Sequence, residues 1–174
     1  MKYDLIVVVV VLISIMSCRG GDNEGDNIIL HIPDDDEMEQ INRYMVQKDR
    51  ERIESYIERK GVNMTLSPHG FWYHIADSGS GDRFGFGDTI VIEYTTTLLD
   101  GTVCYSSDES GPRTITVGKS DIESGLDQAL RMLKPGAGAK IILPYFLAHG
   151  LLGDGNRIPG RSVVVYEIEI VEPK

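Results

Sequence analysis

The chain has 174 residues, which is enough for one globular domain with extensions, and a quarter of them are charged. Its formal net charge is −10. Because phosphate binding needs clustered Lys and Arg, this balance argues against a nucleic-acid partner. The acidity indicates a soluble, self-repelling protein and does not identify a substrate.

Residues 1–17 are predicted to be a lipoprotein signal peptide. The apolar run LIVVVVVLISIM, Leu5 to Met16, is shorter than the roughly 20 residues that a spanning helix needs. The run ends in IMSC and resembles a bacterial lipobox, in which the cysteine, here Cys18, is acylated. The alternative is an ordinary signal peptide with an incidental cysteine. We expect lipidation at Cys18 to anchor the protein in the cell envelope, facing the periplasm, with the outer membrane as the expected site.

Residues 18–36 are rich in Gly, Asp and Asn at their start and are typical of a flexible acidic tether. An apolar island at Ile28–Ile32 interrupts the tether, and the sequence does not identify what it contacts. If Cys18 is acylated, Cys104 is the only free thiol in an oxidising compartment. An intramolecular disulfide is then impossible, and a CxxC redox pair does not occur.

Residues 37–80 are predicted to form a helical extension followed by a strand. Apolar side chains recur at helical spacing in two groups, which are Ile41, Tyr44 and Met45, then Ile53, Tyr56 and Ile57. Asp49, between the groups, could cap a second helix, so the pattern indicates either two short helices or one kinked helix. Gly61 is the expected helix stop. The charged residues of this segment indicate a solvated face, and we assign it no site.

Residues 81–174 are predicted to form an α+β domain, an antiparallel sheet wrapped around one short helix. Strands are expected at 90–98, 114–117, 139–143 and 162–172, with a helix at 124–133. Together with the strand at 71–76, four or more antiparallel strands surround a single helix. Along the last strand, Val164, Tyr166, Ile168 and Ile170 face one way, whereas Glu167 and Glu169 face the other.

The stretch LLDGTVCYSS, residues 98–107, is predicted to be a hairpin with Asp100-Gly101 as a two-residue turn. Cys104 and Tyr105 lie on the returning strand. Taken alone, Cys104 could be core filler, a reactive thiol or part of a site wall.

The sequence contains no recognisable motif for metal binding or for nucleophilic catalysis. The four histidines, His31, His69, His74 and His149, show no metal-ligand spacing with Cys or carboxylates. Neither a GxSxG elbow nor a phosphate-binding loop occurs. We therefore expect no cofactor, and a function that needs no acid–base residues.

The chain contains, in this order, the stretches GDTIVIEYTTTLLDGTVCYSS, ITVGKSDIESGLDQALRMLKPGAGAKIILPYFLAHG and IPGRSVVVYEIEIVE. In sequence and in order these stretches resemble FKBP-type peptidyl-prolyl cis-trans isomerases. The preceding helix and the strand GFWYHI look like the extension of envelope-anchored members, some of them linked to gliding motility. The resemblance implies proline-containing polypeptides as clients. Such an enzyme lowers a barrier of about 18–20 kcal/mol, which arises from amide resonance, by favouring the twisted amide in an apolar socket.

The resemblance also implies a set of site residues. The positions that match are Tyr94 as a wall tyrosine, Ile122 with its backbone N–H as a carbonyl donor, Ile158 in the late loop, and Tyr166 on the last strand. The positions that depart are Cys104 in place of a pocket Phe, Tyr105 in place of Asp, Arg113 in place of an aromatic, Leu126 in place of a floor Trp, and His149 in place of a hydrogen-bonding Tyr. We interpret Cys104 as a pocket wall. Arg113 is expected at the pocket rim, with Glu123 or Asp121 as its candidate partner.

The residues support three readings of function. The first is a lipid-anchored prolyl isomerase that assists folding of exported proteins. The second is a peptide-binding or chaperone module on the same fold with weak or no catalysis, which the departures favour. The third is a structural envelope protein whose helical extension mediates dimerisation.

Overall fold

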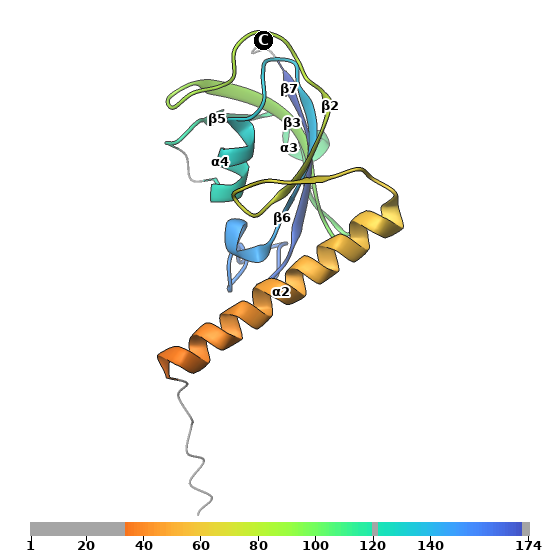
Figure 1. Cartoon of the computed structure of the whole chain (residues 1–174). Helices are drawn as coiled ribbons and strands as arrows, with labels where there is room; N and C mark the ends of the chain where they lie inside the picture. The colour runs from red at the N-terminus through yellow and green to blue at the C-terminus, as the bar shows by residue number, and fades with distance from the viewer. Residues whose placement is uncertain (1–33, 120–121, 172–174) are drawn as a thin grey trace, which may run out of the picture. The chain divides into compact units, whose positions relative to one another are not determined.

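The computed structural model describes residues 34–119 and 122–171 (Figure 1). The predicted signal peptide, Cys18, His31 and the island at Ile28–Ile32 lie outside the described residues, as does Asp121. Within the described part of the chain, every helix is too short or too polar to cross a membrane.

Helix α2 (Asp35–Lys60) is one continuous helix, so the interpretation of Asp49 as the cap of a second helix is wrong. Asp49 lies in the middle of α2 and is buried, where its carboxylate accepts a hydrogen bond of 3.4 Å from the backbone N–H of Tyr145. The side chain therefore serves a contact between α2 and the rest of the domain rather than a helix start. Burial raises the pKa of the Asp49 carboxyl, although the bond from Tyr145 and the Arg52 charge oppose this shift.

The seven strands form one antiparallel sheet, as the sequence predicts. They are β1 (Thr65–Leu66), β2 (Trp72–Asp77), β3 (Thr89–Leu98), β4 (Val103–Ser106), β5 (Arg113–Thr116), β6 (Gly138–Leu143) and β7 (Val164–Val171). The order is β1-β2-β6-β7-β3-β4, and the first half of β3 pairs with β5 while its second half pairs with β4. The strand of the predicted extension, β2, pairs with β6 and so belongs to the same sheet as the predicted isomerase domain.

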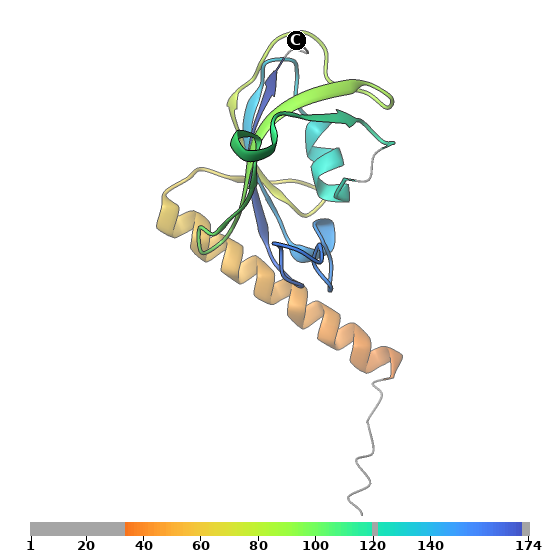
Figure 2. The same cartoon turned by 180° about the vertical axis from the view of Figure 1, so that it is seen from behind.

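The two faces of the sheet carry separate hydrophobic clusters. On one face, α4 (Ser124–Leu130) packs Leu126, Ala129 and Leu130 into the main core (Figures 1 and 2). On the other, the C-terminal half of α2 contributes Ile53 and Tyr56 to a smaller cluster with Trp72, Ile142, Val163 and Val165. Ile141 and Ile142 are consecutive on β6 and belong to different clusters. This assignment follows from the alternation of side chains along a strand.

The hairpin between β3 and β4 differs from the predicted two-residue turn. Among the described non-glycine residues only Arg161 has positive φ, whereas Gly101 has φ 93°. The Gly101 N–H donates to the Leu98 carbonyl at 3.0 Å, and the Asp100 carboxylate accepts from the Thr102 N–H at 2.9 Å. The loop therefore has three residues and ends in a left-handed glycine, a common alternative to the two-residue turn.

Helix α4 approaches the sheet more closely than a larger residue at its first turn would permit. A Cβ built on Gly125 would lie 2.8 Å from Leu143 Cδ2 and 2.9 Å from Leu147 Cβ. Leu147 belongs to the short helix η1 (Tyr145–Leu147), which follows β6. This close contact positions Ile122 and Glu123, which immediately precede α4, beside the end of the sheet.

Candidate functional site

A pocket of about 410 Å³ lies between the start of α4, the segment after η1 and strands β3, β4, β5 and β7. It collects most of the residues that the sequence predicts for a site. Its lining comprises Tyr94, Thr96, Tyr105, Arg113, Ile122, Glu123, Ala148, His149 and Tyr166. These residues are far apart in the sequence, between positions 94 and 166. They converge because β7 lies beside β3 in the sheet and α4 packs across one face of that sheet.

The wall at Tyr94 is held by the short helix α3 (Ser107–Ser110). The Tyr94 N–H donates to Ser107 Oγ at 3.1 Å, and that hydroxyl lies 3.3 Å from the Tyr94 carbonyl, to which it donates. The phenol oxygen of Tyr94 lies 3.3 Å from Ser110 Oγ. Both ends of this residue are therefore fixed by one turn of helix.

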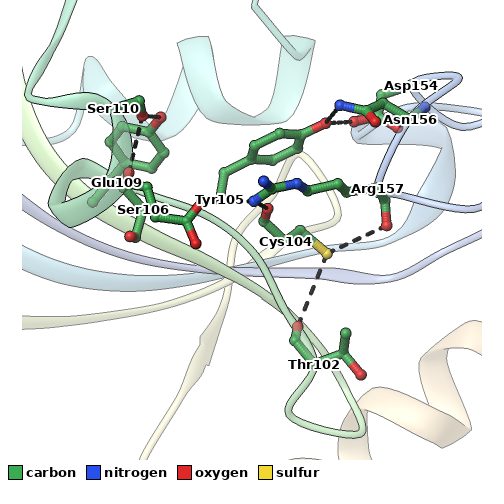
Figure 3. A network of polar contacts seen from close by, with 10 residues as sticks. Thr102, Cys104, Tyr105, Ser106, Glu109, Ser110, Asp154, Asn156 and Arg157 are labelled. Carbon is green, nitrogen blue, oxygen red and sulfur yellow. Dashed lines mark hydrogen bonds and ion pairs between the residues drawn. The ribbon is translucent and has the colours of Figure 1, made fainter.

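The second tyrosine of the wall, Tyr105, is fixed by the loop after η1 (Figure 3). Its hydroxyl donates a short hydrogen bond to Asp154 and accepts one of 3.2 Å from Asn156 Nδ2. The guanidinium carbon of Arg157 lies 5.5 Å from the centre of the Tyr105 ring, within the range of a cation–π contact. The bond to Asp154 is the largest cause that raises the pKa of Tyr105, with burial second. Tyr105 therefore lines the pocket as a neutral, oriented ring.

A polar cluster of Glu123, His149 and Tyr166 forms the inner part of the pocket. The Tyr166 hydroxyl donates to Glu123 Oε1 at 2.6 Å, and His149 Nε2 lies 2.8 Å from the same oxygen. The imidazole N–H does not point along that short separation, so Nε2 makes no hydrogen bond in this arrangement. Burial, followed by the Glu123 charge, raises the pKa of Tyr166 well above its usual value, so this phenol stays neutral.

The sequence assigned Glu123 only as a candidate partner of Arg113, and the structure makes it a pocket residue. Its side chain is 7% exposed and it precedes α4 as the N-cap residue. The sequence could have indicated this role, because Glu123 directly follows the predicted site residue Ile122 and both precede the predicted helix. Arg113 lines the pocket and is half-buried, as predicted for a rim residue. Among the described residues no ion pair joins it to Glu123.

Three predicted substrate-binding residues lie in the main core and do not line this pocket. Cys104 and Leu126 are 0% exposed, and Ile158 is 2% exposed. In the pairing of β3 with β4, Thr96 faces Tyr105 and Thr97 faces Val103, so Cys104 is the extra residue of a β-bulge. Its sulfur lies 3.6 Å from the Arg157 carbonyl (Figure 3). Contact of these three residues with substrate stays a prediction.

A larger hollow of about 650 Å³ lies on the other face of the sheet. Its lining includes the charged residues Glu93, Lys140 and Glu167, of which the last two form an ion pair of 2.7 Å. Apart from Tyr94, the predicted site residues are absent from its lining. We therefore place the candidate site in the smaller pocket.

The model of the FKBP-type peptidyl-prolyl cis-trans isomerase family matches residues 81–171, which contain the whole pocket. The chain belongs to this family. Its relatives include the outer membrane protein MIP of Legionella longbeachae, which is 34% identical over 112 residues. That match covers 64% of this chain and 47% of the Legionella protein. The macrophage infectivity potentiator of Trypanosoma cruzi is 31% identical over 140 residues, which cover 78% of this chain and 68% of that protein.

Solved FKBP structures share the fold. The crystal structure of AtFKBP13 superposes with a TM-score of 0.59 at 27% identity, covering 64% of this chain and 99% of that one. The chain spans about half the length of the Legionella relative. Family membership and fold are thus shown by comparisons that cover the FKBP domain.

Proposed function

We propose that the protein is a peptidyl-prolyl cis-trans isomerase that acts on proline-containing polypeptides at the pocket of Tyr94, Tyr105 and Tyr166. The convergence of these three rings with Ile122 in one pocket, inside the region that matches the family, is the observation that carries the proposal. The chemistry needs no metal or nucleophile. It needs a socket that favours the twisted amide over the planar one.

The pocket meets that requirement with rings that are held in place before a peptide binds. The Tyr94 backbone is fixed by Ser107 and the Tyr105 hydroxyl by Asp154. The twisted amide has lost its resonance and charge separation, so an environment with less water favours it. Ile122 supports the same effect as the apolar lining residue beside the start of α4.

The experiment is a protease-free isomerisation assay, in which exchange between cis and trans resonances of a prolyl peptide is measured by NMR. The full chain in detergent should accelerate the exchange. Tyr94→Ala should lower kcat/KM by about tenfold, because removal of this half-buried aromatic wall forfeits roughly 1.5 kcal/mol of apolar contact. Its matched control is Tyr44→Ala, at a tyrosine that is 62% exposed on α2, which should leave the rate unchanged. Equal exchange with and without the protein would contradict the proposal.

A peptide-binding module with weak or no catalysis is the second candidate. The polar lining favours it, because Arg113 and Glu123 replace part of the apolar surface that would stabilise the twisted amide. The same NMR sample separates the two functions. Shifts of the peptide resonances without faster exchange would indicate a binding module, whereas faster exchange indicates the enzyme.

We further propose that the protein is a lipoprotein of the cell envelope, anchored through Cys18, where it assists folding of exported proteins. The lipobox-like IMSC after a short apolar run supports the anchor, and the family relative named an outer membrane protein supports the location. Uncatalysed prolyl isomerisation takes about 10–100 s at 25 °C, so an exported client that must isomerise a prolyl bond gains from a catalyst near the membrane.

A further inference from the structure

Arg113 is a half-buried cation at the border between the main core and the pocket. It begins β5, where it pairs with the buried Ile92 of β3. Side chains two residues apart on a strand share a face, so Arg113 lies on the same side of β5 as Ile115, which is buried in the main core. A guanidinium thus ends a row of apolar side chains and lines the pocket. Its charge is permanent, because arginine does not lose its proton in proteins.

The charge of Arg113 has no counter-ion among the described residues. Arg157, the guanidinium above the Tyr105 ring, differs in this respect (Figure 3). It lies 2.7 Å from Glu109 and donates to the Cys104 carbonyl at 2.8 Å. The contacts of Arg157 therefore compensate its charge within the protein. A partly buried charge without a partner is costly, so a bound group of opposite charge is favoured beside Arg113.

The carboxylate of the pocket itself, Glu123, does not serve as this partner. It is buried at the inner end, where its Oε1 accepts the Tyr166 hydroxyl at 2.6 Å. Burial is the largest cause that raises the pKa of Tyr166, and the charge of Arg113 is close enough to oppose this rise. A second carboxylate that entered as deeply as Glu123 would be repelled by it, whereas one that stayed beside Arg113 would be attracted.

We propose that Arg113 is a specificity-determining residue that binds the carboxylate of an Asp or Glu adjacent to the proline of the bound polypeptide. This inference rests on the proposed function, because it names the substrate class of the same pocket. The planar guanidinium offers parallel N–H groups that match the two oxygens of a carboxylate. The proline ring would lie among the three tyrosines, while the acidic side chain stays at the rim. An aromatic residue, which the family resemblance implies at this position, would not supply such a charge.

The net charge of −10 does not cancel a preference of this kind. At physiological salt the Debye length is about 8 Å, so exposed charges far from the pocket are largely screened. The preference should amount to about threefold to tenfold in kcat/KM, the effect of one partly exposed hydrogen bond between charged groups. It should appear in KM, because a carboxylate held by Arg113 is bound both before and during rotation of the amide.

The test compares matched peptides by NMR exchange at pH 7.5, with the full chain in detergent. One pair is N-acetyl-Ala-Glu-Pro-Phe-amide and the same peptide with Gln for Glu, which place the carboxylate or its neutral counterpart before proline. The other pair, N-acetyl-Ala-Leu-Pro-Glu-amide and its Gln counterpart, places them after proline. Wild type should prefer the acidic member of at least one pair, and the preference should shrink between 50 and 500 mM NaCl. Arg113→Gln should reduce the ratio to about one, and Arg113→Glu should bring it below one.

The matched control is Arg83→Gln, which removes the same charge at an exposed position outside the pocket and should keep the wild-type ratio. The wild-type comparison needs no variant, so it remains decisive if the Arg113 variants fail to fold, as judged by circular dichroism. Equal kcat/KM for the acidic and neutral peptides of both pairs in an active wild-type protein would overturn the inference and leave the isomerase proposal standing. A preference that persists in folded Arg113→Gln would also overturn it. Absence of exchange with every peptide would overturn the isomerase proposal instead, and calorimetric affinities of the same peptides then decide the role of Arg113.

Discussion

Cys104 is fully buried although its neighbours reach the surface, since Val103 is 53% exposed and Tyr105 is half-buried. The β-bulge explains this difference, because the extra residue of a bulge changes the direction of its side chain relative to the ladder. Burial is the largest cause that raises the pKa of the Cys104 thiol, followed by the charges of Asp154 and Asp100. The thiol should therefore react slowly with alkylating reagents in the folded protein.

The size of the side chain at position 104 provides the first prediction. Cys104→Phe should destabilise the fold by about 1–3 kcal/mol, because extra volume in a packed core forces side chains from their rotamers. Urea unfolding followed by fluorescence measures the change. Val103→Phe is the matched control, one residue away and exposed, and should stay within about 0.5 kcal/mol of wild type. A stable Cys104→Phe protein with raised kcat/KM would show instead that the ring enters the pocket, as the sequence resemblance implies.

Asp154 provides the second prediction, which concerns acid. Burial opposes the charge of this carboxylate, but hydrogen bonds from Tyr105 and from the N–H groups of Asn156 and Ile158 prevail and lower its pKa below 3.8. A carboxyl with a lowered pKa in the folded state stabilises the fold above its unfolded pKa, and this contribution is lost as the pH falls through the folded value. The free energy of unfolding of Asp154→Asn should therefore depend less on pH between about 5 and 2.5 than that of wild type.

The control for the acid prediction is Asp82→Asn. Asp82 is exposed and forms no hydrogen bond with another described residue. Its substitution should leave the acid dependence of unfolding as in the wild type. If Asp154→Asn and wild type lose stability in parallel, the loop around Asp154 does not contribute through this carboxylate.

The sequence predicts the members of the site better than their roles. Tyr94, Ile122, His149 and Tyr166 converge as the resemblance implies, because each lies at a fixed place on a strand or helix start. The full burial of Cys104 could not be predicted, because a one-residue bulge cannot be seen in the alternation of β4. The role of Glu123 depends on a contact of 2.6 Å with a residue 43 positions later, which no local pattern encodes.

At the scale of elements, the alternation of side chains along β7 correctly predicts which residues of its inner face are buried. It does not predict the burial of a residue on the outer face. Glu167 and Glu169 are exposed and Tyr166, Ile168 and Ile170 are buried, as the pattern indicates. Val165 is also buried, because α2 covers that end of the outer face. The helical pattern of α2 likewise predicts two apolar groups, of which the second packs into the hydrophobic cluster beneath the helix. Ile41 and Tyr44 of the first group are exposed.

That difference along α2 provides the third prediction. Ile53 is 0% exposed and packs against the sheet, so Ile53→Ala should cost about 2–5 kcal/mol in the free energy of unfolding. Ile41→Ala is the same change on the same helix at a side chain that is 44% exposed, and should cost less than about 0.5 kcal/mol. Urea unfolding of the two variants measures both values. Equal losses would show that the first half of α2 is packed in solution, as in the dimerising extension of the third reading.

At the scale of the whole molecule, the extension is part of the fold. The described residues from position 36 to position 171 belong to one compact unit, in which β2 pairs with β6 and α2 closes the second hydrophobic cluster. The domain boundary predicted at position 81 marks the start of the part that matches the family model. The strands β1 and β2 precede this boundary but belong to the same sheet as the strands that follow it. Truncation at that boundary would remove α2 and the two strands β1 and β2 at one side of the sheet. Ile142 and Val165 would then be exposed, so an isolated segment 81–174 should not represent the protein.

The last prediction concerns the proposed lipid anchor at Cys18. If residues 18–36 are the flexible tether that the sequence predicts, they would span roughly 20–25 Å and would let the pocket meet unfolded chains near the membrane surface. Cys18→Ala should abolish incorporation of radiolabelled palmitate and move the protein from the membrane to the soluble fraction, because several acyl chains supply the membrane affinity. Cys104→Ala is the matched control, since it removes the other cysteine and should leave both labelling and location unchanged. Palmitate labelling that survives Cys18→Ala would rule out the proposed anchor, whereas loss of labelling with unchanged isomerase activity would show that the lipid determines location and not catalysis.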